Sequence, residues 1–250
     1  MNIKNLTKSY GGVPVVKDVS FTIPEGKVMS IIGPNGAGKS TVMGMISRLI
    51  EKDKGEIEFK GKDLNSWKSK ELSKKLSILT QSNNVNLALT VRELVNFGRF
   101  PYSGSRLDEK DNAIVDAALK TMELDDIADK YIDQLSGGQR QRAFVAMTIA
   151  QDTDYILLDE PTNNLDIYHA TQLMKKVRTF SEDFGKTVVM VLHEINLAAA
   201  YSDYICAMYQ GEIKKVGTVE EVMTKEILSD MYKVDFEIMD INGRPLSIYF

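Results

Sequence analysis

The chain has 250 residues, 43% of them hydrophobic, which is enough to bury a substantial core. Its 31 basic and 35 acidic residues give a net charge of −4, which excludes the strongly basic surface of a general nucleic-acid binder, so we expect no nucleic-acid partner. The single cysteine, Cys206, excludes an intramolecular disulfide and a cysteine zinc cluster.

Strand-like and helix-like segments alternate along the chain, which predicts an α/β architecture with a largely parallel sheet. Residues 15–23 and 56–61 alternate between apolar and polar positions, as half-buried strands do. Residues 28–33, 155–160 and 187–193 are apolar runs typical of strands that are buried on both faces. Three such runs indicate a central sheet covered on both sides.

Two further segments depart from this alternation. Residues 82–133 have helical periods and almost no strand pattern, which predicts an inserted helical lobe over residues 81–135. Near the C-terminus, Asn242-Gly243 lies between two alternating runs and predicts a β-hairpin within residues 233–250. The longest apolar runs are far shorter than the roughly 20 residues that cross a membrane, so we expect any membrane span to come from another chain.

Residues 33–41, GPNGAGKST, match the phosphate-binding pattern G-x-x-x-x-G-K-[ST] between a buried strand and a helical segment. In this P-loop the backbone N–H groups and the helix N-terminus would hold phosphates, Lys39 would bridge the β- and γ-phosphates, and the Ser40 hydroxyl would bind Mg²⁺. The alternative is a glycine-rich turn with a solvated lysine. The expected binding residues are Gly33, Pro34, Asn35, Gly36, Ala37, Gly38, Lys39, Ser40 and Thr41.

Acidic and imidazole side chains follow two of the buried strands. Because ligands bind at the carboxyl ends of strands in open α/β sheets, Asp159 and Glu160 are expected near the phosphates, with Asp159 holding Mg²⁺ and Glu160 acting as general base toward water. A polar strand end that leads into a proline turn is the alternative. His193, after the next buried strand, is a further candidate at the same sheet edge, although a lone histidine there is more often structural.

Two more residues are candidates for the same site. Gln81, at the end of a strand-like segment, is expected to give a neutral oxygen to Mg²⁺ and to signal the state of the ligand to the helical lobe. A surface glutamine is the alternative. Tyr10 is expected to stack on an adenine, and packing in the core is the alternative.

Residues 135–139, LSGGQ, precede an apolar helical run. A serine and two glycines at a helix start leave backbone N–H groups uncovered, so Ser136, Gly137 and Gly138 are expected to bind a phosphate with bare N–H groups. With the P-loop, Gln81, YILLDEPT, NNLD at 163–166 and His193, this order of motifs resembles the ATP-binding cassette (ABC) ATPases of ABC transporters.

The resemblance implies a P-loop NTPase ABC ATPase fold with a RecA-like core, an antiparallel β subdomain and an inserted α-helical subdomain. Residues 1–80 and 136–232 would form the catalytic core with the β subdomain, 81–135 the helical subdomain, and 233–250 a C-terminal hairpin extension. It also implies that ATP and Mg²⁺ are sandwiched in a head-to-tail dimer with a second copy of the chain. Ser136, Gly137, Gly138 and Gln139 of one copy would then face the ATP on the other copy's P-loop.

In the same resemblance His193 would contact the γ-phosphate and orient the attacking water, and Asp166 links the two sites across the dimer interface. The sequence departs from many relatives by having Asn163-Asn164 before the Leu-Asp pair, where serine or threonine is common. This departure puts in question how strongly the two ATP sites of the dimer are coupled, but it does not affect the expected chemistry of ATP hydrolysis.

Residues 87–107 and 193–204 are similar to importers of iron-siderophore, haem and cobalamin complexes. The likeness implies an ATPase at the cytoplasmic face of the membrane that powers uptake of a ferric siderophore or related chelate. Its partners would be membrane-spanning permease subunits, received in a groove near Gln81 and residues 84–102, and indirectly an extracytoplasmic substrate-binding protein. An importer ATPase for haem or cobalamin, or a soluble ABC ATPase without a transporter, remains the alternative.

Overall fold

The computed structural model describes residues 1–81, 88–104 and 106–249. The chain divides into two compact units, one formed by Met1–Trp67 with Val177–Phe250 and the other by Lys68–Lys176. We call them the P-loop unit and the helical unit and describe each by itself. None of the helices in these residues combines the length and apolar character that a membrane span requires.

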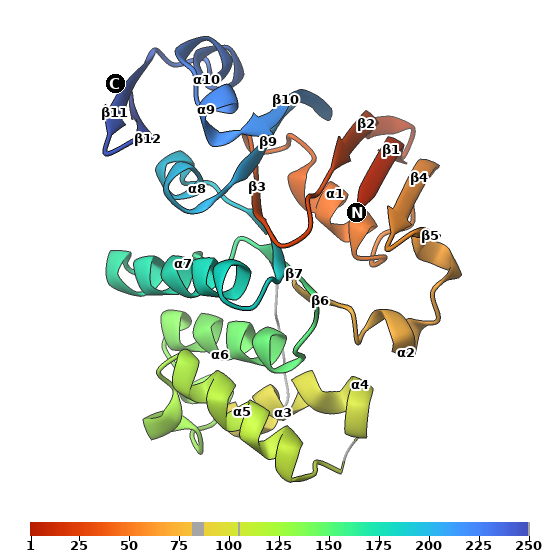
Figure 1. The fold of residues 1–250 in the computed structure, drawn as a ribbon, viewed down its shortest axis with the longest axis vertical. Coiled ribbons are helices and arrows are strands. Elements are labelled where there is room, and N and C mark those ends of the chain that lie inside the picture. The colour runs from red at the N-terminus through yellow and green to blue at the C-terminus, as the bar shows by residue number, and fades with distance from the viewer. Residues whose placement is uncertain (82–87, 105, 250) are drawn as a thin grey trace. The chain divides into compact units, whose positions relative to one another are not determined.

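The P-loop unit begins with an antiparallel sheet in the strand order β2-β1-β4-β5 (Figure 1). The strands predicted at 15–23 and 56–61 are confirmed as β2 and β4. The sequence analysis did not predict β1, which pairs with both of them. The strands are β1 (Asn2–Tyr10), β2 (Val13–Thr22), β4 (Lys54–Phe59) and β5 (Lys62–Asp63), followed by the 3-10 turn η1 (Leu64–Ser66).

A largely parallel set of strands forms the core of the same unit. Every residue of β3 (Val28–Ile32) and of β8 (Thr187–Val191) is buried, as their apolar sequences predict. β3 runs parallel to β8 and to β9 (Tyr204–Tyr209), and β10 (Glu212–Thr218) closes the edge antiparallel to β9. The helices α1 (Lys39–Ile46) and α8 (Ile195–Tyr201) follow β3 and β8 along the chain.

The last part of the P-loop unit contains α9 (Val219–Val222), α10 (Lys225–Tyr232) and a hairpin of β11 (Phe236–Ile241) with β12 (Arg244–Tyr249). The hairpin predicted around Asn242-Gly243 is confirmed, because Ile241 pairs with Arg244 across a two-residue turn. Both turn residues have positive φ, 55° and 75°, the conformation for which an Asn-Gly pair is suited.

The helical unit contains one parallel strand pair and most of the described helices. β6 (Leu76–Leu79) pairs with β7 (Tyr155–Asp159). Residues 91–121 are mainly helical, in agreement with their sequence periods. The remaining elements are α2 (Ser69–Leu72), α3 (Val91–Asn96), η2 (Phe97–Arg99), α4 (Phe100–Ser103), α5 (Glu109–Thr121), η3 (Asp125–Ile127), η4 (Ile132–Gln134), α6 (Gly137–Ala150) and the start of α7 (Ile167–Glu182).

A buried ion pair fixes the helices of this unit to one another. Arg99 Nε donates to Asp111 Oδ1 at 2.8 Å, and both side chains are about 95% buried. The Ser103 hydroxyl and then Arg99 hold the pKa of the Asp111 carboxyl below its usual range. Arg99 also donates to the carbonyl of Ala150 at the end of α6, so one guanidinium joins η2, α5 and α6. Removing one partner of such a pair leaves a buried charge uncompensated, which costs roughly 3–5 kcal/mol.

Candidate functional site

The P-loop leaves the buried end of β3 and leads directly into α1. The N-cap of α1 is Gly38, which has no side chain that could cover the helix N-terminus. The buried Lys39 ammonium donates to the carbonyls of Gly33 at 2.8 Å and Pro34 at 3.1 Å, so the side chain folds back over the loop. Such a loop brings a helix N-terminus and a fixed positive charge to one point, as a phosphate site requires.

Close packing explains two of the loop glycines. A Cβ at Gly33 would lie 2.1 Å from the carbonyl oxygen of Met208 on β9, and one at Gly38 would lie 2.8 Å from the carbonyl oxygen of Val15 on β2. Both distances are shorter than any real carbon–oxygen contact. The loop is therefore packed closely against β9 at Gly33 and against β2 at Gly38, where no side chain larger than that of glycine fits.

His193 lies at the same edge of the sheet as the P-loop. Ile31 of β3 is in register with Val191 of β8, and Leu192 N–H donates to the Ile31 carbonyl at 3.2 Å. Gly33 and His193 each follow this pair by two residues, just past the ends of the neighbouring parallel strands β3 and β8. His193 is exposed at this edge.

Tyr10 is half exposed at the end of β1, with 48% of its surface accessible, so the alternative of core packing does not hold. It pairs with Val13 of β2, two residues before the Val15 carbonyl that abuts Gly38. Lys8 Nζ lies 5.5 Å from the centre of the ring. Tyr10 therefore stands on the hairpin that packs against the P-loop.

The helical unit contains the acidic strand end. Asp159 is the last residue of β7, and Asp159 and Glu160 are 6% and 9% exposed. Leu79 of β6 is in register with Leu158 of β7, so Gln81, which is exposed, is level with Glu160. The two strand ends thus bring an amide and a carboxylate to one edge, as the sequence predicts for parallel strands.

Glu160 has an unusual backbone conformation that its neighbours stabilise. Its φ is 52°, in the left-handed region that few residues other than glycine occupy. Gln141 of α6 donates from Nε2 to the carbonyls of Glu160 at 3.4 Å and Pro161 at 3.2 Å. Such strain is concentrated at functional sites, where the surrounding structure holds it in place. The sequence analysis missed Gln141, whose partners lie about 20 residues away along the chain.

The structure corrects one feature predicted for the signature turn, which we define as residues 135–139. The Ser136 N–H is not bare, because it donates to Gln139 Oε1 at 3.1 Å while Ser136 Oγ accepts from Gln139 N–H at 3.3 Å. This capping box satisfies the serine within its own helix, which sequence reasoning overlooked. Gly137 and Gly138 occupy the first turn of α6, where no intrahelical carbonyl is available to their N–H groups.

The signature turn lies against the segment that contains Asp166. A Cβ at Gly138 would lie 3.2 Å from the carbonyl oxygen of Asn164. Asn164 has a φ of 61°, a conformation that asparagine tolerates better than serine or threonine, which gives a physical reason for the residue found there. Asp166 Oδ1 accepts from the backbone and the ring of His169, both at 2.8 Å, and these bonds lower the pKa of the Asp166 carboxyl.

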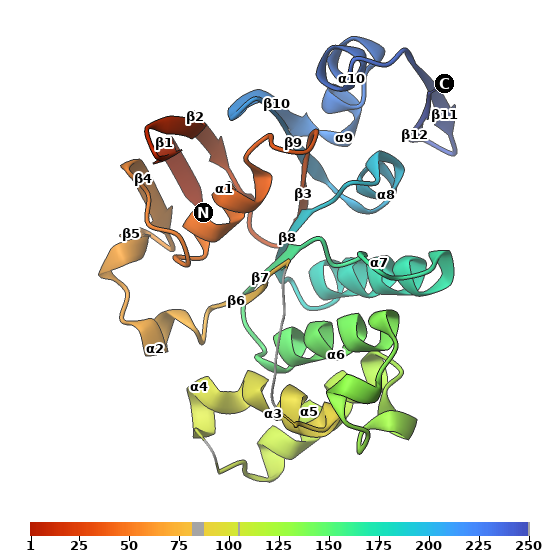
Figure 2. The same ribbon diagram turned by 180° about the vertical axis from the view of Figure 1, so that it is seen from behind.

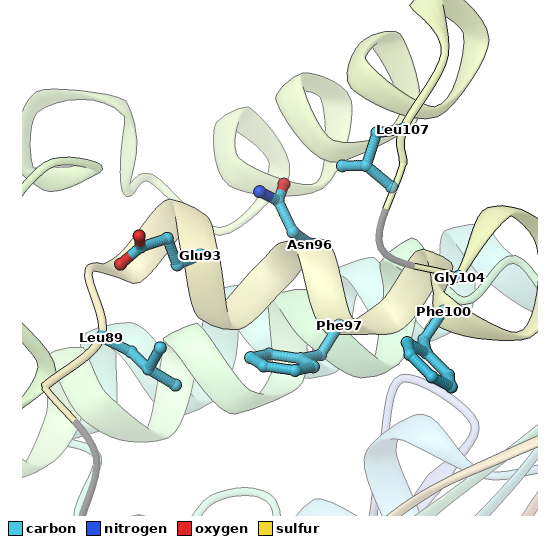
Figure 3. Close-up of a pocket in the computed structure, with 7 residues that line it drawn as sticks. All are labelled: Leu89, Glu93, Asn96, Phe97, Phe100, Gly104 and Leu107. Atoms are coloured by element: carbon cyan, nitrogen blue, oxygen red, sulfur yellow. The ribbon is translucent and has the colours of Figure 1, made fainter.

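The helical unit also has an apolar groove on α3, η2 and α4 (Figure 3). Its volume is about 280 Å³, and Phe97 and Phe100 are 49% and 61% exposed in it. Asn96 Oδ1 is buried in the lining and accepts no hydrogen bond from any described residue. The part of the predicted groove at residues 84–87 lies outside the described residues. The lining residues are Leu89, Glu93, Asn96, Phe97, Phe100, Gly104 and Leu107.

Comparisons with known proteins agree with these features. The model of the ABC transporter family matches residues 16–163. The chain is 51% identical to the petrobactin import ATP-binding protein YclP of Bacillus subtilis, over 100% of this chain and 99% of YclP. It is 45% identical to the petrobactin import ATP-binding protein FatE of Bacillus anthracis over the full length of both chains.

A solved structure extends the similarity to three dimensions. The dimeric bacterial ABC transporter cassette MJ0796 superimposes with a TM-score of 0.80 at 33% identity, over 87% of this chain and 98% of that one. Sequence, motifs and fold thus agree over nearly the whole chain. The chain therefore belongs to the ABC transporter family, has the ABC ATPase fold, and is a nucleotide-binding ATPase that powers transport.

Proposed function

We propose that this chain hydrolyses ATP at the cytoplasmic face of the membrane to drive import of a ferric siderophore through a separate permease. The observation that carries the substrate class is the 51% identity, over essentially the whole of both chains, to a petrobactin import ATP-binding protein. The 45% identity to FatE, a second petrobactin import ATP-binding protein, again over the full length, supports the same substrate class. An extracytoplasmic binding protein would deliver the chelate to the permease.

In the proposed site the P-loop binds the phosphates of ATP. Lys39, already directed over the loop, exchanges its bonds to the Gly33 and Pro34 carbonyls for contacts with the β- and γ-phosphates. The N-terminus of α1 adds its partial positive charge, and Tyr10 stacks on the adenine. These contacts come from the P-loop unit alone.

Glu160 is the proposed general base, and its carboxylate accepts a proton from the attacking water. The backbone of Glu160 is held by Gln141, which restricts the directions in which the side chain can point. His193 contacts the γ-phosphate and orients the water. The roles of both residues rest on their positions at strand ends and on the family resemblance.

The oxygen donors proposed for Mg²⁺ fit that ion. Ser40, Gln81 and Asp159 offer a hydroxyl, an amide oxygen and a carboxylate, and Mg²⁺ favours oxygen ligands with one or two carboxylates beside the phosphates. When bound, Mg²⁺ would neutralise charge on the phosphate oxygens.

A second copy of the chain completes each site in this proposal. The first turn of α6 is exposed at Ser136 and Gly137, so it is accessible to a phosphate held by another molecule. A helix N-terminus favours an anion there. The dimeric state of the cassette MJ0796 supports this arrangement, and Asp166 would couple the two sites across the interface.

The permease would dock in the apolar groove of the helical unit. Its exposed phenylalanines offer apolar surface to a cytoplasmic helix. The buried Arg99–Asp111 ion pair joins the helices around the groove, so they would move as one rigid body and transmit motion between the ATPase and the permease.

Uptake of radioactive iron tests the substrate class. Cells that lack this chain should lose uptake of ferric petrobactin and regain it from a plasmid with the wild-type gene but not with Glu160→Gln. Haem and cobalamin serve as controls, and their uptake should not change. If the deletion abolished uptake of haem or cobalamin and spared every iron chelate, the siderophore assignment would be wrong while the ATPase assignment stood.

A further inference from the structure

The C-terminal hairpin holds both ends of α8, the helix that follows His193 (Figure 2). At the first turn of α8, Asn196 makes three hydrogen bonds with Ser247 of β12. Asn196 Nδ2 donates to the Ser247 carbonyl at 3.0 Å, and Asn196 Oδ1 accepts from the Ser247 N–H and hydroxyl, each at 2.8 Å. Ser247 is 3% exposed, so this contact is shielded from water.

The other end of α8 is fixed by Arg244, the first residue of β12. Its Nη1 donates to the carbonyls of Ala199 at 3.2 Å and Ser202 at 3.3 Å, two of the carbonyls that a helix end leaves without intrahelical partners. A cation at a helix C-terminus is also favoured by the helix dipole. On its other side Ser202 is tied to the core, because its hydroxyl lies 2.6 Å from that of Ser30 on β3.

These contacts leave His193 between two fixed points. Before it, β8 is held in register with β3. After it, only Glu194 separates His193 from α8, and the Glu194 side chain does not cap that helix. The direction of the His193 side chain therefore depends on where α8 lies, and α8 is held by residues about 50 positions further along the chain.

We infer that the β11–β12 hairpin positions His193 for ATP hydrolysis, with Arg244, Ser247 and Asn196 acting as positioning residues through α8. The inference rests on the proposed role of His193 at the γ-phosphate. It gives the C-terminal extension a part in turnover although none of its residues is expected to touch the nucleotide. We call the bonds of Arg244 and Ser247 to α8 the clamp. Loss of the clamp should lower kcat while the P-loop contacts that set nucleotide affinity remain.

The test compares Arg244→Met with Lys225→Met in the purified full chain. Both changes remove one positive charge from the last part of the P-loop unit, but Lys225, at the start of α10, pairs with Asp235 at 2.9 Å and makes no contact with α8 among those given above. Arg244→Met should lower kcat about five- to tenfold with a KM for ATP within about twofold of wild type, whereas Lys225→Met should leave both unchanged. An equal loss in the two variants, or a rise in KM that accounts for the loss, would overturn the inference.

A double-mutant cycle separates positioning from general stability. If Arg244 acts through His193, Arg244→Met should cause no further loss in a His193→Ala background, because both changes remove the same contribution. Equal fold-losses in the two backgrounds would overturn the clamp and leave the proposed role of His193 intact. Full turnover by His193→Ala would overturn that role and the clamp together. If a thermal melt shows that Arg244→Met is already unfolded at the assay temperature, Ser247→Ala takes its place, because it removes only one bond of the clamp. Its loss of kcat should be smaller and should also disappear in the His193→Ala background.

Discussion

The P-loop and the signature turn each present a helix N-terminus, yet they are built in opposite ways. The P-loop has a glycine N-cap, is packed closely against two strands and contains a buried lysine. The signature turn has a serine N-cap that is satisfied by a capping box and is exposed to solvent. The first is packed within one unit and the second is a capped helix start that is open to solvent, so we expect the first to bind phosphate within its own unit and the second to receive one from another molecule.

This difference predicts that changes in the two turns affect different steps. A change in the P-loop should weaken nucleotide binding by the isolated chain. A change in the signature turn, or in the acidic strand end of the same unit, should leave that binding intact and lower turnover. Four substitutions test the separation.

The largest effect is expected for Glu160→Gln, which removes the proposed base and keeps the shape of the side chain. General-base catalysis contributes about 10²- to 10⁴-fold, so kcat should fall by that factor while ATP affinity stays the same. Phosphate release and calorimetric titration measure the two quantities. Glu109→Gln, at the first position of α5, is the matched control and should have no effect. Turnover at the wild-type rate in Glu160→Gln would remove Glu160 from the mechanism.

Lys39→Ala changes the P-loop and should weaken nucleotide binding. The buried ammonium would make charge-assisted bonds to two phosphates, and losing about 3 kcal/mol in such bonds weakens ATP binding roughly 100-fold. Calorimetric titration of the isolated chain measures this loss. Lys4→Ala, an exposed lysine on β1, is the control. Undiminished affinity in Lys39→Ala would contradict the P-loop assignment.

The sequence predicts the strand-loop-helix geometry of residues 28–46 well because the pattern is contiguous. The glycine spacing, the lysine and the flanking buried strand all lie within about 20 residues. The parallel strands behind it are similarly local, since an unbroken apolar run is enough to place them in a core. The register of those strands then determines that Gly33 and His193 share one edge.

Features that depend on distant contacts or irregular backbone could not be predicted. β1 was missed because its pairing shifts register between Ile3 and Leu6, around Asn5 with its positive φ, which breaks the alternation of apolar positions. The Asn-Gly turn predicts a hairpin, but nothing local indicates that Ser247 binds Asn196, 51 residues before it. The capping box of Ser136 is different, because a serine and a glutamine three residues apart are its local signature and make it predictable from the sequence.

Ser136→Ala tests whether the exposed turn acts on phosphate beyond capping its helix. The change removes a cap worth about 1 kcal/mol and, in the proposed dimer, a hydroxyl contact to the γ-phosphate, so turnover should fall about tenfold with unchanged ATP affinity in the isolated chain. Thr90→Ala is the matched control, since Thr90 caps α3 with the same kind of capping box in the same unit. Equal losses in the two variants would assign Ser136 to helix capping alone.

Tyr10→Ala should have the smallest effect and, like Lys39→Ala, should weaken nucleotide binding. Stacking of a base on an aromatic ring contributes about 1–3 kcal/mol, and a ring that is 48% exposed belongs at the low end, so ADP affinity should weaken about fivefold. Tyr10→Phe keeps the stacking face and should bind ADP as the wild type does. Val13→Ala, an exposed apolar residue paired with Tyr10 in the same hairpin, controls for disturbance of β1 and β2. If Tyr10→Phe and Val13→Ala lost as much affinity as Tyr10→Ala, the hairpin would support the P-loop only by packing against Gly38, and the adenine would have no ring from this unit beneath it.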